Sequence, residues 1–405
     1  MIHRKKFDFV LAGFLGALIL MGCLAIFTAS TTTIGEYTTT QSHWWKQLIF
    51  AAISLGMVWL LIRLPMPILD LIIVPAYVIN ILALIAVLFT PAVNGSHRWF
   101  SLFGINYQPS ESAKLFTLLV VARVICKDNM SELRQILYGL ALILVPVLLI
   151  LIEPDFGTTL VFFFSLLAML VAADVPLVWL LLLVSPVVSM VSSLWWPAMI
   201  IWIAVLVGLL LWSRLSWVTT SISAILNGFI ALIMPVFWNG LKDYQQSRIV
   251  SFLNPMADPL GAGYQIIQAK IAVGSGSIIG KGWLQGTQKN MNFLPEHHTD
   301  FIFSVIGEEF GFLGALLLLT AFGLFFWRII TDISEIKVRE RKIASAGIFA
   351  YLMFQTFINI GMNIGLVPAT GIPLPFVSYG GSNLLFNTLA VGVILKYLNE
   401  RGLMK

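Results

Sequence analysis

A single carboxylate stands out in the longest polar stretch of the sequence. Asp258 lies in the run Asn254-Pro255-Met256-Ala257-Asp258-Pro259-Leu260-Gly261. The prolines and the glycine favour a turn over a helix at this point. A carboxylate on a turn that faces a desolvated cavity can act as a general base, because burial raises its pKa toward neutrality. An Asp before Pro is also an ordinary turn former, and the local sequence alone favours that simpler interpretation.

A glycine-rich run with nearby lysines follows Asp258. It reads Lys270-Ile271-Ala272-Val273-Gly274-Ser275-Gly276-Ser277-Ile278-Ile279-Gly280-Lys281-Gly282. The glycine spacing and the residue after Lys281 do not fit a P-loop, and the third glycine of a dinucleotide fingerprint is missing. We expect a flexible loop that could bind an anionic head group through backbone N–H groups and through Lys270, Lys281 and Lys289.

Ionisable residues also enter one of the apolar segments. Glu111 and Lys114 are one turn apart on the same face of a helix that begins near Pro109. An interfacial ion pair with a snorkelling Arg98 is the simpler interpretation. Because ionisable groups in a membrane helix are costly and usually face a polar cavity, we favour a cavity-facing position.

Two further segments interrupt the apolar pattern near the C-terminal end. His297, His298 and Asp300 could bind a cation, but their contiguous spacing gives poor tetrahedral geometry, so no protein metal site is predicted. Residues 363–383 contain three prolines and four glycines, which cannot continue a helix. Irregular backbone at membrane depth is tolerated only where it is buried in protein or lines a wet cavity.

The elements that must position these residues are membrane-spanning helices. The chain has 405 residues, of which 59% are hydrophobic and 11% charged, and its mean hydropathy is +0.93. This composition excludes a soluble globule. Twelve apolar segments are predicted to span a membrane, at residues 8–28, 46–63, 67–90, 111–126, 135–152, 157–173, 176–194, 197–213, 218–238, 300–328, 343–366 and 380–398.

The distribution of basic residues predicts the orientation of these segments. Lys and Arg gather between alternate segments, which places both termini in the cytoplasm and makes nucleic-acid binding unnecessary to explain the net charge of +5. The first apolar run is too long for a cleaved signal peptide, so we expect a retained helix. Residues 239–299 are the only long polar insertion, and they fall on the extracytoplasmic side together with most of the interfacial tryptophans.

Taken together, these motifs resemble the SEDS family (shape, elongation, division and sporulation) of polytopic membrane proteins. The resemblance rests on Arg98-Trp99, on Gln108-Pro109-Ser110-Glu111 with Lys114, on Glu153-Pro154-Asp155-Phe156-Gly157-Thr158, and on Asn254 to Gln265, Leu294 to Phe303 and Pro368 to Asn383. It implies an all-α bundle in which residues 1–405 form one membrane domain. The family core has ten transmembrane helices, so we expect two additional helices at 176–213, and one long extracytoplasmic loop at 239–299.

The resemblance also implies an activity. SEDS proteins are peptidoglycan glycosyltransferases that polymerise lipid II, and the catalytic carboxylate of the family falls on Asp258, as general base of an inverting transfer with undecaprenyl pyrophosphate as leaving group. The glycine-rich run looks like the elongation member of the family, which maintains rod shape, and the division member is an alternative. The other site residues, expected to bind substrate, are Arg98, Trp99, Glu111, Lys114, Arg248, Gln265, Lys270, Lys281, His298, Thr299, Asp300, Ser378, Ser382 and Asn383.

No cofactor is implied with certainty, although a divalent cation, Mg²⁺ or Mn²⁺, could assist the pyrophosphate. The partners implied are lipid II, an undecaprenyl-linked glycan chain, membrane lipids, a class B penicillin-binding protein that supplies transpeptidation, and proteins of the elongation complex. The expected location is the bacterial cytoplasmic (inner) membrane. A lipid II flippase would need its carboxylates near mid-membrane, and a scaffold would not need cavity-lining polar residues, so both are less well supported.

Overall fold

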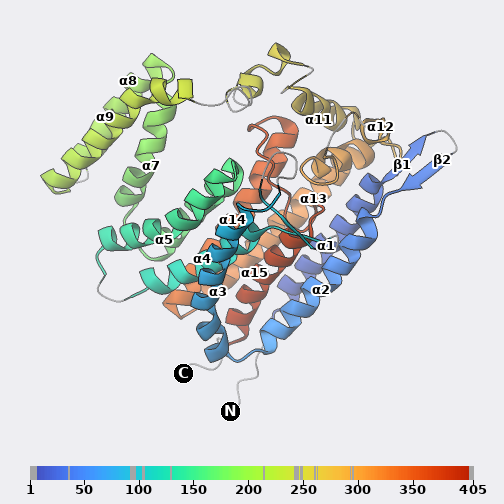
Figure 1. The fold of residues 1–405 in the computed structure, drawn as a ribbon, viewed down its shortest axis with the longest axis horizontal. Coiled ribbons are helices and arrows are strands. Elements are labelled where there is room, and N and C mark those ends of the chain that lie inside the picture. Colours follow the sequence, from blue (N-terminus) through green and yellow to red (C-terminus); the bar gives the residue numbers. More distant parts are fainter. Residues whose placement is uncertain are drawn as a thin grey trace.

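The computed structural model is a bundle of membrane-length helices with both termini at one end (Figure 1). It describes residues 7–34, 37–91, 97–102, 105–127, 130–212, 215–240, 246, 250–259, 261, 263–291, 293 and 296–400. Among these residues, eight helices are long and apolar enough to cross a membrane, and three further apolar helices are shorter. The prediction of an all-α membrane bundle is confirmed, and each of the twelve predicted segments corresponds to a helix.

The main bundle is built around two central helices, α14 and α15. Of the 18-residue apolar stretch of each helix, 67% and 78% is buried inside the structure. α2 and α15 lie side by side along their length, and α6 packs against α14. The bundle consists of α1 (Phe9–Ser30), α2 (His43–Arg63), α3 (Met66–Val87), α4 (Pro109–Ile125), α5 (Glu132–Ile152), α6 (Phe156–Ala172), α13 (Ile302–Ser334), α14 (Arg339–Ile364) and α15 (Gly381–Asn399).

Three helices form a separate unit beside the main bundle (Figure 1): α7 (Leu177–Ser192), α8 (Trp196–Trp212) and α9 (Trp217–Gly240). A buried polar network joins them. Asn227 of α9 donates to Ser185 (2.9 Å) and accepts from Ser189 (2.6 Å), and Trp202 of α8 donates to Ser189 (2.7 Å). Interhelical hydrogen bonds of this kind hold helices together where lipid removes the hydrophobic driving force.

The end of the bundle opposite the termini carries two short antiparallel hairpins that the sequence did not predict. β1 (Thr31–Ile34) pairs with β2 (Tyr37–Thr40), with Thr31 opposite Thr40, between α1 and α2. β3 (Phe100–Leu102) pairs with β4 (Ile105–Tyr107) just before α4. The predicted long loop at 239–299 is partly helical, since it contains a 3-10 turn at Pro255–Ala257, α11 (Tyr264–Ser275) and α12 (Thr287–Asn290).

Helix α13 is broken near its beginning, where Gly311 adopts φ 64° and ψ −159°. The glycine-rich segment after α11 fills the break. The N–H groups of Phe312 and Leu313 donate to the carbonyls of Ser277 (2.9 Å) and Ile278 (3.0 Å), and the carbonyl of Glu308 accepts from the N–H of Lys281 (2.9 Å). The backbone groups freed by the break are therefore satisfied by a segment about thirty residues earlier, as membrane-depth backbone requires.

Candidate functional site

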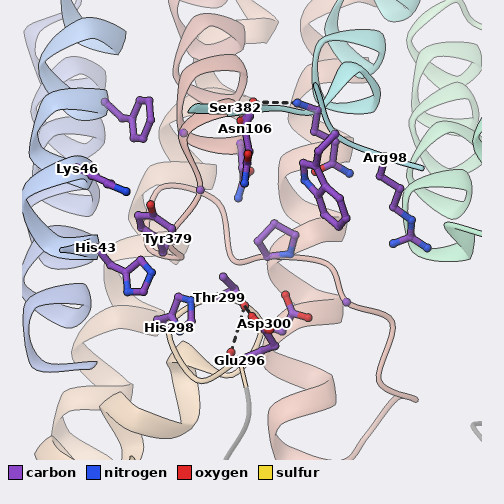
Figure 2. A pocket seen from close by; sticks show the side chains of 18 of the residues that line it. His43, Lys46, Arg98, Asn106, Glu296, His298, Thr299, Asp300, Tyr379 and Ser382 are labelled. Carbon is purple, nitrogen blue, oxygen red and sulfur yellow. Dashed lines mark hydrogen bonds between the residues drawn. The ribbon is translucent and has the colours of Figure 1, made fainter. Parts of the chain in front are cut away.

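A cavity of about 800 Å³ opens at the end of the bundle opposite the termini. Its walls come from the start of α2, the β3–β4 hairpin, the turn between α5 and α6, the loop before α13, and the irregular segment before α15 (Figure 2). Of the predicted site residues, it is lined by Arg98, Trp99, His298, Thr299, Asp300, Ser382 and Asn383. The structure thus brings together residues that lie up to 285 positions apart, from Arg98 to Asn383.

The irregular segment predicted at 363–383 forms the floor of the cavity and is fixed by hydrogen bonds. Ser378, another predicted site residue, lies just beneath the surface. Its hydroxyl donates to the Thr299 carbonyl (2.5 Å) and accepts from the N–H of Leu374 (2.8 Å). Asn359 of α14 donates to the carbonyls of Asp300 (2.9 Å) and Ile372 (2.8 Å). The floor and the Thr299-Asp300 wall are therefore held to α14 as one unit.

A stack of aromatic rings forms one wall. The His43 ring of α2 lies parallel to the His298 ring, with centroids 4.5 Å apart, and Tyr379 packs edge-on against His43 at 4.7 Å (Figure 2). The N–H of Tyr379 donates to the His298 carbonyl (2.9 Å). Burial, together with the charges of His43 and His297, lowers the pKa of His298 to about 4. His298 is therefore neutral at pH 7.

Arg98 is held in the opposite wall by the turn between α5 and α6. Its guanidinium donates to the carbonyls of Glu153 and Pro154, each at 2.7 Å, and lies 3.9 Å from the Asp155 carboxylate. Burial, reinforced by the charge of Asp155, raises the pKa of Glu153 to about 8. Glu153 is thus mostly protonated at pH 7, and the Asp155 carboxylate is the anion that faces Arg98.

Glu111 and Lys114 do not line the cavity. They form a buried ion pair on α4, with the Lys114 Nζ 2.8 Å from each carboxylate oxygen and both side chains at most 3% exposed. The ammonium also lies 5.8 Å from the centroid of the Tyr351 ring. The pair is satisfied within the bundle, so its contribution to a substrate site would be through the placement of α4.

Asp258 lies on an exposed turn outside the cavity lining. Its Oδ1 accepts from the N–H of Gly261 (3.0 Å), which closes the turn. A Cβ at Gly261 would come within 2.7 Å of the Asp258 carboxyl carbon and would push that side chain aside, and one at Gly263 would meet backbone oxygens, so Gly263 requires glycine. The predicted turn is therefore observed, with its carboxylate accessible to solvent.

Two of the lysines in and near the glycine-rich segment, Lys281 and Lys289, form ion pairs with two glutamates on α13. Lys281 lies 2.6 Å from Glu308, which also accepts from the N–H and the hydroxyl of Thr287. Lys289 is fully buried, 2.5 Å from Glu309, and donates to the Thr28 carbonyl at the end of α1. These contacts hold the segment against α13, in place of the flexible loop that the sequence predicts.

Gln265 and Lys270 do not line the cavity. Gln265 is half-buried on α11, and the exposed Lys270 side chain lies across Gly365 at the end of α14, where a Cβ would meet its aliphatic carbons. Arg248 lies outside the described residues. Among the residues that the structure describes, there is no group of three or more His, Cys, Asp or Glu side chains placed to hold a metal ion.

Several cavity residues were missed from the sequence: His43, Lys46, Asn106, Gln108, Glu296 and Tyr379. A signal for two of them was present. His43 and Lys46 are one turn apart at the start of an apolar segment, which is the spacing that singled out Glu111 and Lys114. Their neighbours Trp44 and Trp45 marked this stretch only as membrane interface, and His43 and Lys46 were given no role.

The fold and the site define a multi-pass membrane protein with a cavity at one end of its bundle that is lined by both polar and apolar side chains. The model of the cell cycle protein family of FtsW, RodA and SpoVE matches residues 9–201 and 196–402. The chain belongs to this family.

Named relatives and a solved structure agree with this assignment. The chain is 37% identical over 331 residues to peptidoglycan glycosyltransferase MrdB of Escherichia coli, covering 81% of this chain and 78% of the relative. It is 34% identical over 396 residues to a probable peptidoglycan glycosyltransferase FtsW of Coxiella burnetii, covering 95% and 94%. A solved structure described as structural coordination of polymerization and crosslinking by a peptidoglycan synthase complex aligns with a TM-score of 0.73 at 27% identity, covering 98% of both chains.

Proposed function

We propose that this peptidoglycan glycosyltransferase polymerises lipid II at the outer face of the bacterial cytoplasmic membrane, during cell elongation. The observation that carries the proposal is the cavity, which combines the cations Lys46 and Arg98 with apolar side chains of α2. A lipid-linked sugar diphosphate needs both kinds of surface. In this orientation the cavity end faces outward, and both termini lie in the cytoplasm.

The reaction that we propose forms one glycosidic bond and breaks one bond to phosphate. The 4-hydroxyl of the acceptor GlcNAc attacks the anomeric carbon of the donor MurNAc and passes its proton to the Asp258 carboxylate. Undecaprenyl pyrophosphate leaves with the bonding electron pair, and the anomeric configuration inverts. Arg98 and Lys46 would stabilise the negative charge that develops on the leaving group. Because Asp258 lies outside the cavity lining, its turn must approach the cavity when substrate is bound.

A divalent cation could supply further charge at the pyrophosphate. The carboxylates in the cavity wall that would hold it are Glu296 and Asp300, which offer the oxygen donors that Mg²⁺ and Mn²⁺ prefer. We further propose that a class B penicillin-binding protein, which cross-links the product, is the partner of this chain. The likeness to a component of a peptidoglycan synthase complex supports that proposal.

The test is polymerisation of purified lipid II by the detergent-solubilised protein, together with a penicillin-binding partner whose transpeptidase is blocked. Removal of a general base typically lowers the rate by about 10²–10⁴. We expect long glycan chains from the wild type, and a loss of that size for Asp258→Ala and Asp258→Asn. Asp174→Asn is the matched control, because Asp174 is an exposed turn carboxylate with φ 63°, a conformation that Asn tolerates.

Two outcomes would contradict the proposal. Equal chains from the wild type and from both Asp258 variants would remove Asp258 from the mechanism. No chains from the wild type, in a preparation that is folded and bound to its partner, would argue against polymerisation and would direct the next measurement to a reconstituted flipping assay.

A further inference from the structure

One residue of the cavity wall before α13 makes its contact outside the cavity. The neighbours of His297, Glu296 and His298, line the cavity (Figure 2), whereas His297 does not. The His297 Nε2 lies 3.1 Å from the carbonyl oxygen of Ala29, near the end of α1. Because a carbonyl oxygen only accepts hydrogen bonds, Nε2 carries a hydrogen and donates it. We call residues 296–300 the α13 wall, and His297 connects this wall to α1.

The end of α1 depends on the same part of the chain. The last four carbonyls of a helix have no partner within the helix. All four are capped by other groups. In order from the carbonyl of Phe27 to that of Ser30, the caps are the Thr31 hydroxyl, the Lys289 ammonium, the His297 ring and the N–H of Gln41. Two of the four caps therefore come from the segment that leads into the α13 wall.

The α13 wall is a tight turn that carries backbone strain. Glu296 has φ 50°, a left-handed conformation that residues other than glycine rarely adopt. Its carbonyl accepts from the N–H groups of Thr299 (3.2 Å), Asp300 (3.1 Å) and Phe301 (3.3 Å), which closes the turn. Such strain persists only where the surrounding contacts fix the backbone. The hydrogen bond from His297 to α1 is one of these contacts, and it is made by the residue next to the strained one.

We propose that His297 is a positioning residue of the transferase, which fixes the carboxylates of Glu296 and Asp300 in the cavity through its hydrogen bond to α1. Lys289, eight residues earlier, holds the same segment to the same helix end. This inference rests on the proposed function, because Glu296 and Asp300 are the carboxylates that would hold a divalent cation at the pyrophosphate. His297 itself lies outside the cavity lining and acts through its neighbours.

The experiment compares three single variants of the detergent-solubilised protein. His297→Ala removes the hydrogen bond to Ala29, and His297→Gln retains an N–H donor. Thr31→Val is the matched control, because it also removes one cap from the end of α1. The Thr31 hydroxyl bonds to the Phe27 carbonyl and lies 3.4 Å from that of Thr40, so its loss breaks no bond to the α13 wall.

Two measurements are made on each variant. The first is the rate of lipid II polymerisation at several substrate concentrations, with the penicillin-binding partner present. The second is amide hydrogen exchange of residues 296–303 without substrate, which reports how firmly the wall is held. A displacement of about 1 Å in a catalytic site can lower the rate about 10²-fold. We expect His297→Ala to lower kcat between about tenfold and a hundredfold, to change KM less, and to speed up the exchange.

The other two variants separate positioning from general stability. His297→Gln should recover most of the lost rate, and Thr31→Val should stay near the wild type in both measurements. A wild-type kcat in His297→Ala would overturn the proposal. Equal losses in Thr31→Val would also overturn it, because they would show that α1 only needs all of its caps. A His297→Gln variant no better than His297→Ala would overturn it too, since the hydrogen bond would then not be the cause.

Failure of the proposed function gives a different result. In that case the wild type does not polymerise lipid II, and the exchange measurement decides the inference without activity. Faster exchange of residues 296–303 in His297→Ala, but not in Thr31→Val, would support the placement of the wall by His297. Equal exchange in the wild type and in His297→Ala would overturn it.

Discussion

At the scale of single residues, the buried ion pair of Glu111 and Lys114 makes a specific prediction for stability. Glu111→Gln would leave the Lys114 ammonium buried without its counter-charge, and removal of one partner of such a pair typically costs about 3–5 kcal/mol. We therefore expect a large fall in the thermal unfolding temperature of Glu111→Gln in detergent. The double variant Glu111→Gln with Lys114→Met should recover much of that stability, because it leaves no unpaired charge.

The same variants separate a structural role from substrate binding. If the double variant is stable and still polymerises lipid II, the pair acts by fixing α4. A double variant with wild-type stability and no activity would show that the charges themselves are needed by the reaction, which would contradict the structural interpretation that their burial supports.

His298 makes the stability of the protein depend on pH in the acidic range. Its pKa is about 4 in the folded protein, compared with about 6.5 for an unperturbed histidine. Between these values the unfolded chain binds a proton that the folded protein does not, so the free energy of unfolding falls as pH decreases from about 6.5 to about 4. The slope from this group is at most about 1.4 kcal/mol per pH unit.

His298→Phe keeps a ring against His43 and Tyr379 but cannot take up a proton. We expect its unfolding free energy to change less steeply with pH over this range than that of the wild type, measured by denaturant unfolding at several pH values. An unchanged slope would mean that His298 does not titrate below its ordinary range, and that its stacking against His43 imposes no penalty on the protonated form.

The residues that line the cavity could be predicted from the sequence only where they belong to a recognisable motif. Arg98, His298 and Asp300 were found because they sit in loops that interrupt the apolar pattern. His43 and Lys46 were missed because they stand beside Trp44 and Trp45, which indicated only a membrane interface. Glu111 and Lys114 were expected to face the cavity, and no local pattern reveals which way α4 rotates within the bundle.

At the scale of elements, the break in α13 depends on Gly311. Its φ and ψ of 64° and −159° are accessible in practice only to glycine, and a Cβ there would come within 2.6 Å of the Ile278 carbonyl oxygen. Gly311→Ala should therefore lower the stability by about 1–3 kcal/mol or more, and should displace the segment 276–282 from the break.

Gly323→Ala is the matched control, because Gly323 lies on the same helix and a Cβ added there would meet nothing within 4 Å. It should be neutral or slightly stabilising, as alanine is the better helix former. Thermal unfolding and limited proteolysis of the 276–290 segment would compare the two. Equal stability of both variants, with no change in proteolysis, would mean that α13 can run straight through this point.

The sequence could not predict this break, because its cause is not local. Gly311 lies in an apolar run that reads as one continuous helix. The break frees backbone N–H groups after Gly311 and carbonyl groups before it. Their hydrogen-bond partners lie between Ser277 and Gly282, in a segment that the sequence analysis interpreted as a flexible glycine-rich loop. The same segment is fixed by Glu308 and Glu309, whose role depends on a tertiary contact that sequence spacing does not show.

At the scale of the whole molecule, the helices were predictable and their arrangement was not. An apolar run of about 20 residues is dictated by the thickness of the bilayer, so hydropathy alone locates each span. The packing of α7, α8 and α9 against one another depends on side-chain hydrogen bonds such as Asn227 to Ser185, which a hydropathy pattern does not record.

The orientation of the molecule gives the last prediction. The β1–β2 hairpin lies at one end of the bundle and the termini at the other (Figure 1). The cavity is lined by the start of α2, next to the hairpin, so opposite faces of the membrane must expose the cavity and the termini. Lys337 in the turn between α13 and α14, and Arg339, Arg341 and Lys342 in the first turn of α14, lie near the termini end, which predicts that this end is cytoplasmic. Single cysteines in a background lacking Cys23 and Cys126 would report the two faces.

We expect Thr39→Cys, on the exposed strand β2, to react with a membrane-impermeant maleimide in intact spheroplasts. Lys337→Cys, in the exposed turn between α13 and α14, should react only after permeabilisation. The reverse pattern would place the cavity on the cytoplasmic side, where a polymerase that delivers glycan strands to the cell wall has no use for it. Because both cysteines are exposed in the folded protein, the difference in labelling reports the membrane barrier and not local burial.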